Sequence, residues 1–249
     1  MTSIDTGTSV LRTRGLRKEY GREASLVRAV DGVDLEVERG ETVAIMGPSG
    51  CGKSTLLYLL GGLDRPTSGE IWLDGQDVTR LSERALARLR RDAIGFVFQA
   101  FHLMDELTAV ENVELPALLA GRSPRAARQR ATELLDRVGL TDRARFLPTQ
   151  LSGGQRQRVA VARALVADPL VVLADEPTGN LDSASARDVL QLFDQLHGAG
   201  QTLVVVTHDV QVAATADRMI SMRDGAFIDQ STPSRDTSGR LGALAGLEG

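Results

Sequence analysis

The chain has 249 residues, of which 42% are hydrophobic and 25% are charged, a composition typical of a globular protein with a sizeable core. Its 29 Lys and Arg residues face 33 Asp and Glu residues, and the net charge of −4 argues against electrostatic binding to nucleic acid by the chain as a whole. The single cysteine, Cys51, excludes an internal disulfide, and we expect neither a secretion signal nor a bilayer-spanning run of roughly 20 apolar residues.

The first part of the chain predicts β-structure followed by a strand, a glycine loop and a helix. Leu35 and Val37, after Ala29 and Val30, alternate with polar residues as in an antiparallel hairpin or ribbon. Short apolar runs predict the next strands, and Asp74-Gly75 is a hairpin turn signal. The expected elements are a strand at Glu41–Met46, a helix at Ser54–Leu60 and a strand at Glu70–Leu73.

The middle of the chain is predominantly helical in its pattern. An Arg-rich amphipathic helix precedes another short strand, and a long helical stretch follows it. The expected elements are the helix Glu83–Arg91, the strand Ile94–Phe98, and helices from about Ala100 to Leu147 with breaks at Pro116, Gly121 and Pro124.

The last part of the chain predicts a βαβ unit. Leu170–Ala174 and Leu203–Val206 have the continuous apolar character of buried parallel strands, and Val189–Leu196 lies between them as a helix. Residues 231–249 are rich in Ser, Thr and Gly, which predicts a flexible C-terminal tail.

The run GPSGCGKST at 47–55 fits the phosphate-loop pattern G-x-x-x-x-G-K-[ST], in the strand–loop–helix context that the motif requires. Its glycines let backbone N–H groups turn toward phosphate oxygens, Lys53 adds charge near the β- and γ-phosphates, and Ser54 is a ligand for Mg²⁺. Lys53 is one of two lysines among cations that are otherwise arginines, which favours a specific role for it. A plain glycine turn before a helix is the alternative.

Two carboxylates follow the predicted strand at 170–174. Asp175 stands at the carboxyl end of that strand, where open α/β sheets bind ligands, and an acid there can hold Mg²⁺ through water. We expect Glu176 to point elsewhere and to polarise an attacking water. A pair of solvated loop acids is the alternative.

Polar residues also close two other predicted strands. The amide of Gln99 could ligate the metal and sense a γ-phosphate, and the imidazole of His208 could hydrogen-bond a γ-phosphate oxygen. Taken singly, a polar residue after a strand is more often an ordinary turn residue. Because the ends of parallel strands gather at one edge of a sheet, we expect both beside Gly47 and Asp175.

A second glycine motif, LSGGQ at 151–155, begins a strongly periodic helix. Ser152, Gly153 and the helix start at 154–156 could receive a phosphate. The first loop already encloses one nucleotide, so the second motif makes sense if its phosphate belongs to another copy of the chain. Two copies placed head to tail would then hold two ATP molecules between Lys53 of one and Ser152 of the other. An ordinary serine N-cap is the alternative.

With these motifs in this order, the sequence resembles the ATP-binding cassette (ABC) ATPases over about residues 10–230. LSGGQ matches the family signature letter for letter, and no catalytic position departs from the family pattern. The other resemblances are GPSGCGKST to the Walker A loop, Gln99 to the Q-loop glutamine, Asp175 and Glu176 to the Walker B aspartate and catalytic glutamate, GNLD at 179–182 to the D-loop, and His208 to the switch histidine.

The resemblance implies an ATPase with ATP and Mg²⁺ as cofactors. It implies that Lys53, Glu176 and His208 are catalytic. It further implies that Ser54, Gln99 and Asp175 bind the metal and that Asp182 communicates between subunits. Tyr20 is similar to the adenine-stacking aromatic, with a half-buried surface tyrosine as the alternative. The implied ATP-binding set is Tyr20, Gly47, Pro48, Ser49, Gly50, Cys51, Gly52, Lys53, Ser54, Thr55 and Gln99, and the signature acting in trans is Leu151, Ser152, Gly153, Gly154 and Gln155.

The resemblance also implies the architecture. We expect an α/β fold: a P-loop NTPase core with a mostly parallel central sheet, an N-terminal antiparallel β subdomain, and an inserted α-helical signature subdomain at about 100–165. The ATPase domain would span residues 1–230 and the tail residues 231–249.

The resemblance finally implies partners and location. VFQAFHLMDELTAVENVELP and ADEPTGNLD are similar to the cassettes of lipoprotein-release, macrolide-export and cell-division-type systems. We therefore expect a homodimer on the cytoplasmic face of the inner membrane that powers a separate permease docked near Gln99–Thr108, with no specific nucleic acid partner. The alternatives are a DNA-acting ATPase, whose relatives separate the two glycine motifs by a long coiled coil, a ribosome-acting factor with two cassettes in one chain, and a scaffold that uses ATP only to dimerise.

Overall fold

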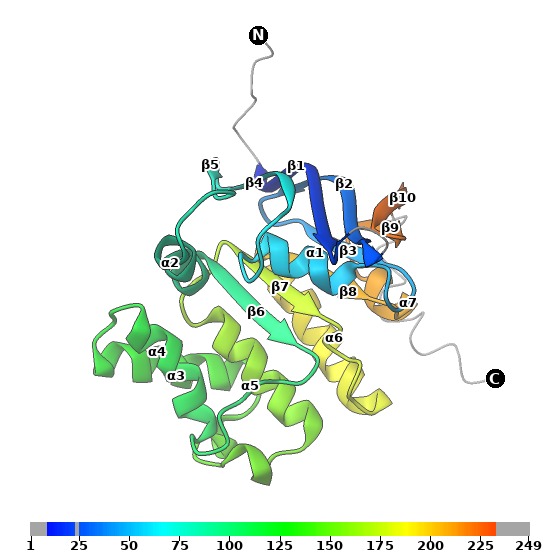
Figure 1. The fold of residues 1–249 in the computed structure, drawn as a ribbon. Coiled ribbons are helices and arrows are strands. Elements are labelled where there is room, and N and C mark those ends of the chain that lie inside the picture. Colours follow the sequence, from blue (N-terminus) through cyan, green and yellow to red (C-terminus); the bar gives the residue numbers. More distant parts are fainter. Residues whose placement is uncertain (1–8, 23–24, 233–249) are drawn as a thin grey trace, which may run out of the picture.

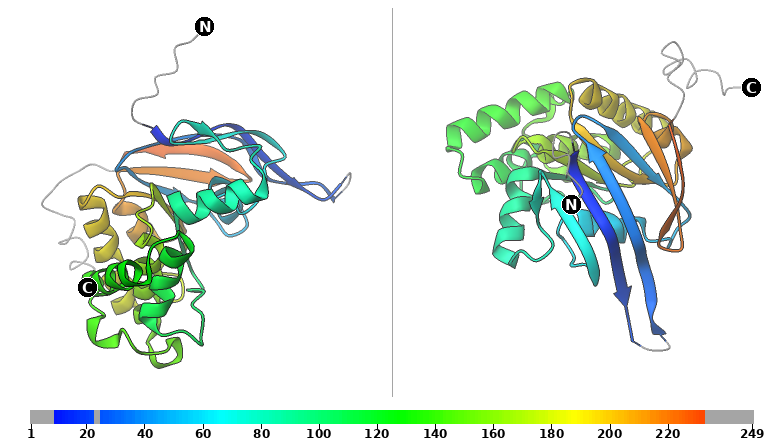
Figure 2. Two further views of the ribbon diagram at one scale, coloured as in Figure 1. Left: turned by 90° about the vertical axis from the view of Figure 1, so that its left-hand side faces the viewer. Right: turned by 90° about the horizontal axis from the view of Figure 1, so that it is seen from above.

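Two β-sheets and a group of helices make up residues 9–22 and 25–232, which the computed structural model describes (Figure 1). The smaller sheet is antiparallel, with the order β2-β1-β4-β5. Its strands are β1 (Ser9–Tyr20), β2 (Val27–Glu38), β4 (Ser68–Leu73) and β5 (Gln76–Asp77). The twelve-residue strands β1 and β2 form a hairpin that reaches beyond the rest of the molecule (Figure 2).

The larger sheet has six strands in the order β10-β9-β3-β8-β7-β6. The neighbours from β9 to β6 are parallel, and β10 pairs antiparallel with β9 at one edge. The strands are β3 (Thr42–Met46), β6 (Ile94–Phe98), β7 (Val171–Asp175), β8 (Thr202–Thr207), β9 (Arg218–Arg223) and β10 (Ala226–Ser231). The mostly parallel sheet and the antiparallel N-terminal sheet confirm the expected fold class.

Both faces of the larger sheet are covered, which explains why β7 and β8 are apolar without alternation. Helix α1 (Lys53–Leu60) lies in a core shared with the antiparallel sheet, where Leu173 and Val206 also point. Val172 and Val205 contribute to the core on the opposite face. The helices that belong to this second core are α3 (Ala109–Leu119), α4 (Pro124–Arg137), α5 (Gly153–Leu165) and α6 (Ser183–Gly198).

Helices α3, α4 and α5 form the lower part of the molecule in Figure 1, inserted in the sequence between β6 and β7. The remaining helices are α2 (Glu83–Ala93), before β6, and α7 (Val210–Ala214), after β8, with short 3-10 turns at Thr141–Arg143 and Pro148–Gln150.

Two details of the helical stretch differ from the sequence prediction. Residues 100–108 are not helical, so the helices begin at Ala109, where Thr108 and Glu111 form a capping box. Pro116 does not break the chain but lies inside α3. Gly121, with φ 86°, and Pro124, at the first turn of α4, are the actual boundaries. Most of the predicted tail, residues 233–249, lies outside the described residues.

Candidate active site

Four neighbouring strands of the larger sheet end at one edge, beside a cavity of about 580 Å³. The order β3-β8-β7-β6 makes neighbours of Gly47, His208, Glu176 and Gln99, which each directly follow one of these strands. The structure therefore brings Gln99 and His208 to the same edge as Gly47 and Asp175, the last residue of β7, as the sequence predicted. The cavity is lined by Val27, Arg28, Ala29, Ser49, Gly50, Gly52, Lys53, Ser54, Thr55, Gln99, Glu176, His208, Asp224 and Gly225.

The glycine loop between β3 and α1 is shaped to receive an anion. Gly50 and Gly52 have φ of 80° and 105°, a conformation that favours glycine, and a Cβ on Gly52 would collide with the Ala29 carbonyl. Gly52 caps α1 without any side-chain hydrogen bond, which leaves the first N–H groups of the helix for a ligand. The Lys53 ammonium, 7% exposed, donates to the carbonyls of Gly47 and Pro48 at 2.7 and 3.1 Å.

A hydroxyl and a carboxylate meet at the base of the cavity. The Ser54 hydroxyl donates to Asp175 Oδ1 at 2.9 Å, and the Tyr58 hydroxyl also hydrogen-bonds Asp175. Burial raises the pKa of the Asp175 carboxyl, although the Ser54 and Tyr58 hydrogen bonds act in the opposite direction. Burial and the neighbouring Asp175 charge raise the pKa of Tyr58. Desolvated oxygens of this kind gain from a bound cation.

Glu176 is held at the mouth of the cavity by the end of β8. Its backbone has φ 45°, which turns the chain sharply after β7 and separates its side chain from that of Asp175. Its Oε2 accepts from the Thr207 hydroxyl and the His208 N–H at 3.2 and 3.3 Å, and its Oε1 lies 3.0 Å from His208 Nδ1. The Lys53 ammonium is 3.9 Å from the same Oε1. A carboxylate, an imidazole and an ammonium thus converge at one point of the cavity lining.

The turns after β6 and β7 are joined by reciprocal amide hydrogen bonds. Gln99 Nε2 donates to Asn180 Oδ1 at 3.1 Å, and Asn180 Nδ2 donates to the Gln99 carbonyl at 3.0 Å. Gly179 leaves room for this contact, since a Cβ there would lie 2.8 Å from Gln99 Nε2. Asp182, two residues after Asn180, caps α6 by accepting from Ala184 N and Ser185 N.

Residues 30–179 match the family model described as "ABC transporter". The chain belongs to the ABC transporter family. It is 50% identical to the Paracoccus denitrificans protein "Macrolide export ATP-binding/permease protein MacB 1/2" over 224 residues, 90% of this chain and 34% of that protein. It is 49% identical to MacB of Rhodopseudomonas palustris over 234 residues, 94% of this chain and 36% of that one. The chain thus spans about a third of the length of these curated relatives.

Solved structures of ABC cassettes share the fold along their whole length. One is a dimeric post-hydrolysis state of the ATP-binding cassette MJ0796 bound to ADP and Pi, with a TM-score of 0.83 and 43% identity, covering 89% of this chain and 98% of that chain. Another is cbiO1 of Clostridium perfringens, part of the transporter complex cbiONQ, with a TM-score of 0.82 and 28% identity over 97% and 96% of the two chains. This ABC chain is an ATPase cassette.

The signature of this ABC cassette lies apart from its cavity. Ser152 caps α5 in a capping box with Gln155, whose N–H it accepts at 3.2 Å. None of the residues 151–155 is among those that line the cavity in the described part of the chain. The ordinary N-cap that the sequence left as an alternative is therefore present, with Ser152 exposed, Gly153 partly exposed and Gly154 buried.

Tyr20 is also absent from the cavity lining among the described residues. Its side chain is 44% exposed, its hydroxyl donates to Asp64 Oδ2 at 2.7 Å, and the Lys18 ammonium lies 4.9 Å from the centre of its ring. Val27 and Arg28 of β2, the strand that pairs with β1, do line the cavity. Cys51 is buried in the loop and likewise does not line the cavity.

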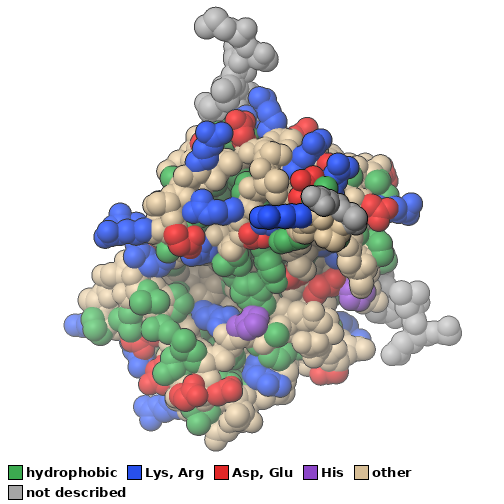
Figure 3. All heavy atoms as spheres, in the orientation of Figure 1, with side chains coloured by type: hydrophobic (Ala, Val, Ile, Leu, Met, Phe, Trp, Pro, Cys, Tyr) green, Lys and Arg blue, Asp and Glu red, His purple; other side chains and the backbone are tan. Residues whose placement is uncertain are grey.

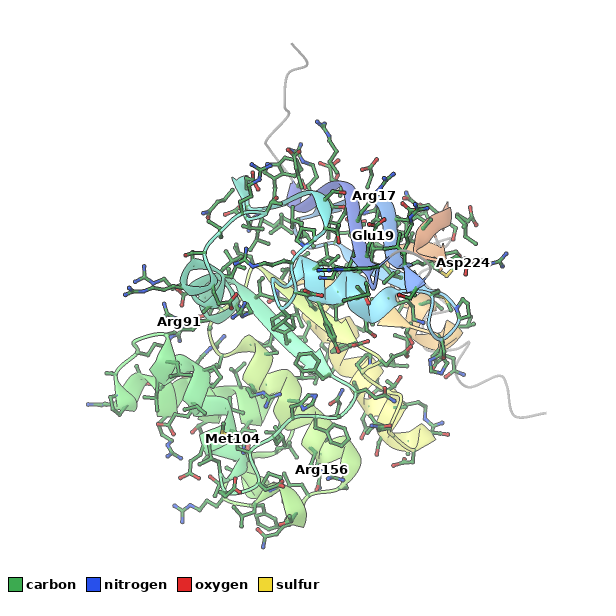
Figure 4. All side chains as sticks on the ribbon, viewed as in Figure 1. Arg17, Glu19, Arg91, Met104, Arg156 and Asp224 are labelled. Carbon is green, nitrogen blue, oxygen red and sulfur yellow. The ribbon has the colours of Figure 1, made fainter. Side chains whose placement is uncertain are left out.

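The sequence reasoning missed several residues at the site. Tyr58 lies four residues after Ser54 on α1 and therefore on the same helix face, a spacing that could have revealed it. Asp224 and Gly225 reach the cavity in the turn between β9 and β10, where Figure 4 labels Asp224. An Asp-Gly pair between two short apolar runs is a hairpin signal.

Proposed function

We propose that this cassette binds and hydrolyses ATP to power a membrane permease, and that the system is of the export or mechanotransmission type. The observation that carries the proposal is the near-50% identity to the ATP-binding part of proteins whose names combine macrolide export, ATP binding and a permease. The cassette therefore corresponds to their ATP-binding third.

The residues of the cavity also support the binding of ATP and Mg²⁺, independently of the comparison with relatives. The glycine cradle and the uncapped start of α1 are suited to phosphates, with Lys53 beside them. Ser54 and Asp175, with Gln99 at the rim, would hold the metal, which would neutralise charge on the phosphate oxygens. The described residues contain no cluster of three or more His, Cys, Asp or Glu that could hold a metal by itself, so phosphate oxygens and water would complete the coordination.

In the proposed reaction, Glu176 orients and polarises the water that attacks the γ-phosphate. Thr207 and His208 fix its carboxylate through the contacts described above. Lys53 and the His208 imidazole stabilise the charge that develops on the phosphate oxygens. Such positioning and electrostatic stabilisation supply most of the catalysis in phosphoryl transfer.

We propose that two copies of the chain form the working unit, each presenting Ser152, Gly153 and Gly154 to the other's cavity. This proposal is supported by the separation of signature and cavity within one chain, since an exposed helix start favours an anion from elsewhere. Asp182, at the start of α6, would communicate between the copies.

The permease would dock near Gln99–Thr108, and the cassette would lie on the cytoplasmic face of the inner membrane. In the described part of the chain, no helix is both long and apolar enough to span a bilayer. Hydrophobic side chains gather on the face drawn in Figure 3 over α3 and α4, and Met104, Leu118 and Leu119 are all exposed. This surface is suited to a helix from the permease.

The alternative of an ATPase acting on DNA or ribosomes has less support. The chain between Lys53 and Ser152 folds into short strands and helices of at most 14 residues in the described structure, not into a long coiled coil. The match to single cassettes also covers nearly all of those chains.

The test is affinity capture from detergent-solubilised native membranes with a tagged Glu176→Gln variant and ATP. We expect an integral membrane protein to co-purify in an ATP-dependent manner, and the Met104→Asp variant to capture less of it while keeping its ATPase activity. Recovery of ribosomes or DNA without a membrane protein would refute the transporter proposal.

A further inference from the structure

Helix α5 contacts the turns after both β6 and β7 through a buried polar side chain. Gln157 is completely buried, two residues after the signature. Its Nε2 donates to the Phe98 carbonyl at 3.3 Å and to the Pro177 carbonyl at 2.6 Å. Gln99 follows Phe98 and Glu176 precedes Pro177, so one amide bridges the exits of the two strands that carry these residues.

Arg163, near the end of the same helix, binds the chain just beyond Gln99. Its Nη2 donates to the Phe101 carbonyl at 2.7 Å and its Nη1 donates to the His102 carbonyl. Partial burial lowers the pKa of the Arg163 guanidinium. A desolvated charge gains most from well-placed hydrogen bonds.

The two carbonyls belong to residues in an unusual conformation. Phe101 and His102 have φ of 61° and 49°, in the left-handed region that residues other than glycine seldom adopt. Such a conformation persists where surrounding contacts hold it. Arg156, labelled on α5 in Figure 4, adds a contact by stacking 5.0 Å from the centre of the Phe101 ring. Helix α5 therefore determines the path of the chain after Gln99.

We propose that Gln157 and Arg163 are positioning residues, which fix α5 to the turns after β6 and β7. Through them, the signature at the start of α5 keeps one spacing from Gln99 and Glu176 of the same copy. The importance of that spacing for turnover rests on the proposed function, in which each copy contributes its cavity to one site and its signature to the other. Two such sites close together only if the spacing within each copy is correct.

The test compares Arg163→Met and Gln157→Met with Arg158→Met as the matched control. Arg158 lies on the same helix and donates to a backbone carbonyl, that of Val138 at 3.2 Å, but this contact leads to the end of α4 and not to a strand exit. Each variant removes polar hydrogen bonds from α5 and keeps a long apolar side chain.

The first readout is backbone hydrogen exchange in the nucleotide-free protein. We expect Arg163→Met to accelerate exchange at least ten-fold in residues 99–104, and Gln157→Met to do so there and in residues 177–182. Arg158→Met should leave both segments unchanged. Unchanged exchange in the Arg163 and Gln157 variants, or equal acceleration in the control, would overturn the proposal.

The second readout separates nucleotide binding from turnover. We expect the Kd for ATP to stay within about three-fold, because Gln157 and Arg163 contact the turns after β6 and β7 and not the phosphate loop, while kcat falls roughly 10- to 100-fold, as misplacement by about 1 Å can cause. Arg163→Lys should recover part of the activity, since an ammonium can still donate to a carbonyl. Parallel losses of ATP affinity, kcat and melting temperature, without rescue by lysine, would indicate a merely structural role and overturn the proposal.

The two readouts also distinguish this proposal from the proposed function. The exchange result does not depend on ATP hydrolysis. Accelerated exchange in the two variants, in a chain whose wild type does not hydrolyse ATP, would support the positioning role and refute the proposed function.

Discussion

Replacing Glu176 by glutamine should abolish hydrolysis while leaving the fold and ATP binding intact. Glutamine has the same shape as glutamate, and its amide oxygen can accept from the Thr207 hydroxyl and the His208 N–H, at 3.2 and 3.3 Å in the wild type. The amide nitrogen can donate to His208 Nδ1, now 3.0 Å from Glu176 Oε1, when the imidazole is neutral. With these contacts kept, the free energy of unfolding should change by less than about 1 kcal/mol.

The catalytic loss should be much larger. A neutral amide cannot polarise water or accept its proton, and removal of a general base costs roughly 10²- to 10⁴-fold in rate. That range corresponds to about 2.7–5.5 kcal/mol of activation free energy. Because ATP is bound but not cleaved, the variant should also accumulate as an ATP-dependent dimer.

The assay is phosphate release at saturating ATP and Mg²⁺, with size-exclusion chromatography of the same samples. Glu133→Gln is the control, since Glu133 is an acid on α4 whose neutralisation removes one charge far from the cavity. A Glu176→Gln variant that turns over within five-fold of the wild type would refute the catalytic role of Glu176. Loss of ATP binding in the variant would refute the reasoning about retained contacts.

Further predictions concern the loop, the buried carboxyl and the core. Gly52→Ala should lose ATP binding in a titration with a fluorescent ATP analogue, because its Cβ would collide with the Ala29 carbonyl and displace the loop; Gly75→Ala, in a turn with open space around it, should not. Asp175→Asn should abolish Mg²⁺-dependent turnover yet raise the urea midpoint at pH 7 in EDTA. Burial raises the pKa of Asp175 in the folded state, so the wild type loses stability as the pH rises above about 3.9, the pKa of aspartate in the unfolded chain. The difference in urea midpoint between Asp175→Asn and the wild type should therefore shrink as the pH falls. A difference that stays constant with pH would contradict this cause. Leu134→Ala, in the core beneath α4, should lower the free energy of unfolding by about 2–5 kcal/mol, whereas Leu119→Ala, 63% exposed, should change it by less than about 0.5 kcal/mol.

The parts of the fold that followed from the sequence are those with strong local patterns. β3, β7 and β8 are continuous apolar runs because both of their faces are covered, and the same burial placed their polar successors at one edge. The sequence did not predict β1 because Gly15 lies where the pairing register with β2 shifts. This shift disrupts the alternation of buried and exposed side chains along the strand. Helix α6 begins six residues earlier than predicted, since its first turn is polar and is fixed by the Asp182 cap.

Pair contacts at the site were less accessible to sequence reasoning than single residues. Ser54 and Asp175 could be proposed from their motifs, but the hydrogen bond between them depends on α1 packing against β7. Gln99 and Asn180 are far apart in the sequence, and their reciprocal bonds exist because β6 and β7 are neighbours in register. The hydrogen bond from Tyr20 to Asp64 likewise joins residues far apart in the sequence, and no local pattern indicates it.

The position of the signature suggests how a second copy of the chain would complete the site. Within one copy the cavity has a phosphate cradle, a candidate metal pair and a candidate base, but one side remains open to solvent at His208, whose side chain is 64% exposed. Water that reaches this side would screen the charges that stabilise the reacting phosphate. The start of α5, where Ser152 is exposed and Gly153 is partly exposed, would offer backbone N–H groups to an anion. Closing the first surface with the second from another copy would exclude water and add donors in the same step, and it would make hydrolysis depend on assembly. In this arrangement the contacts of Gln157 and Arg163 would matter for turnover, because they would fix the signature of each copy relative to the cavity of the same copy.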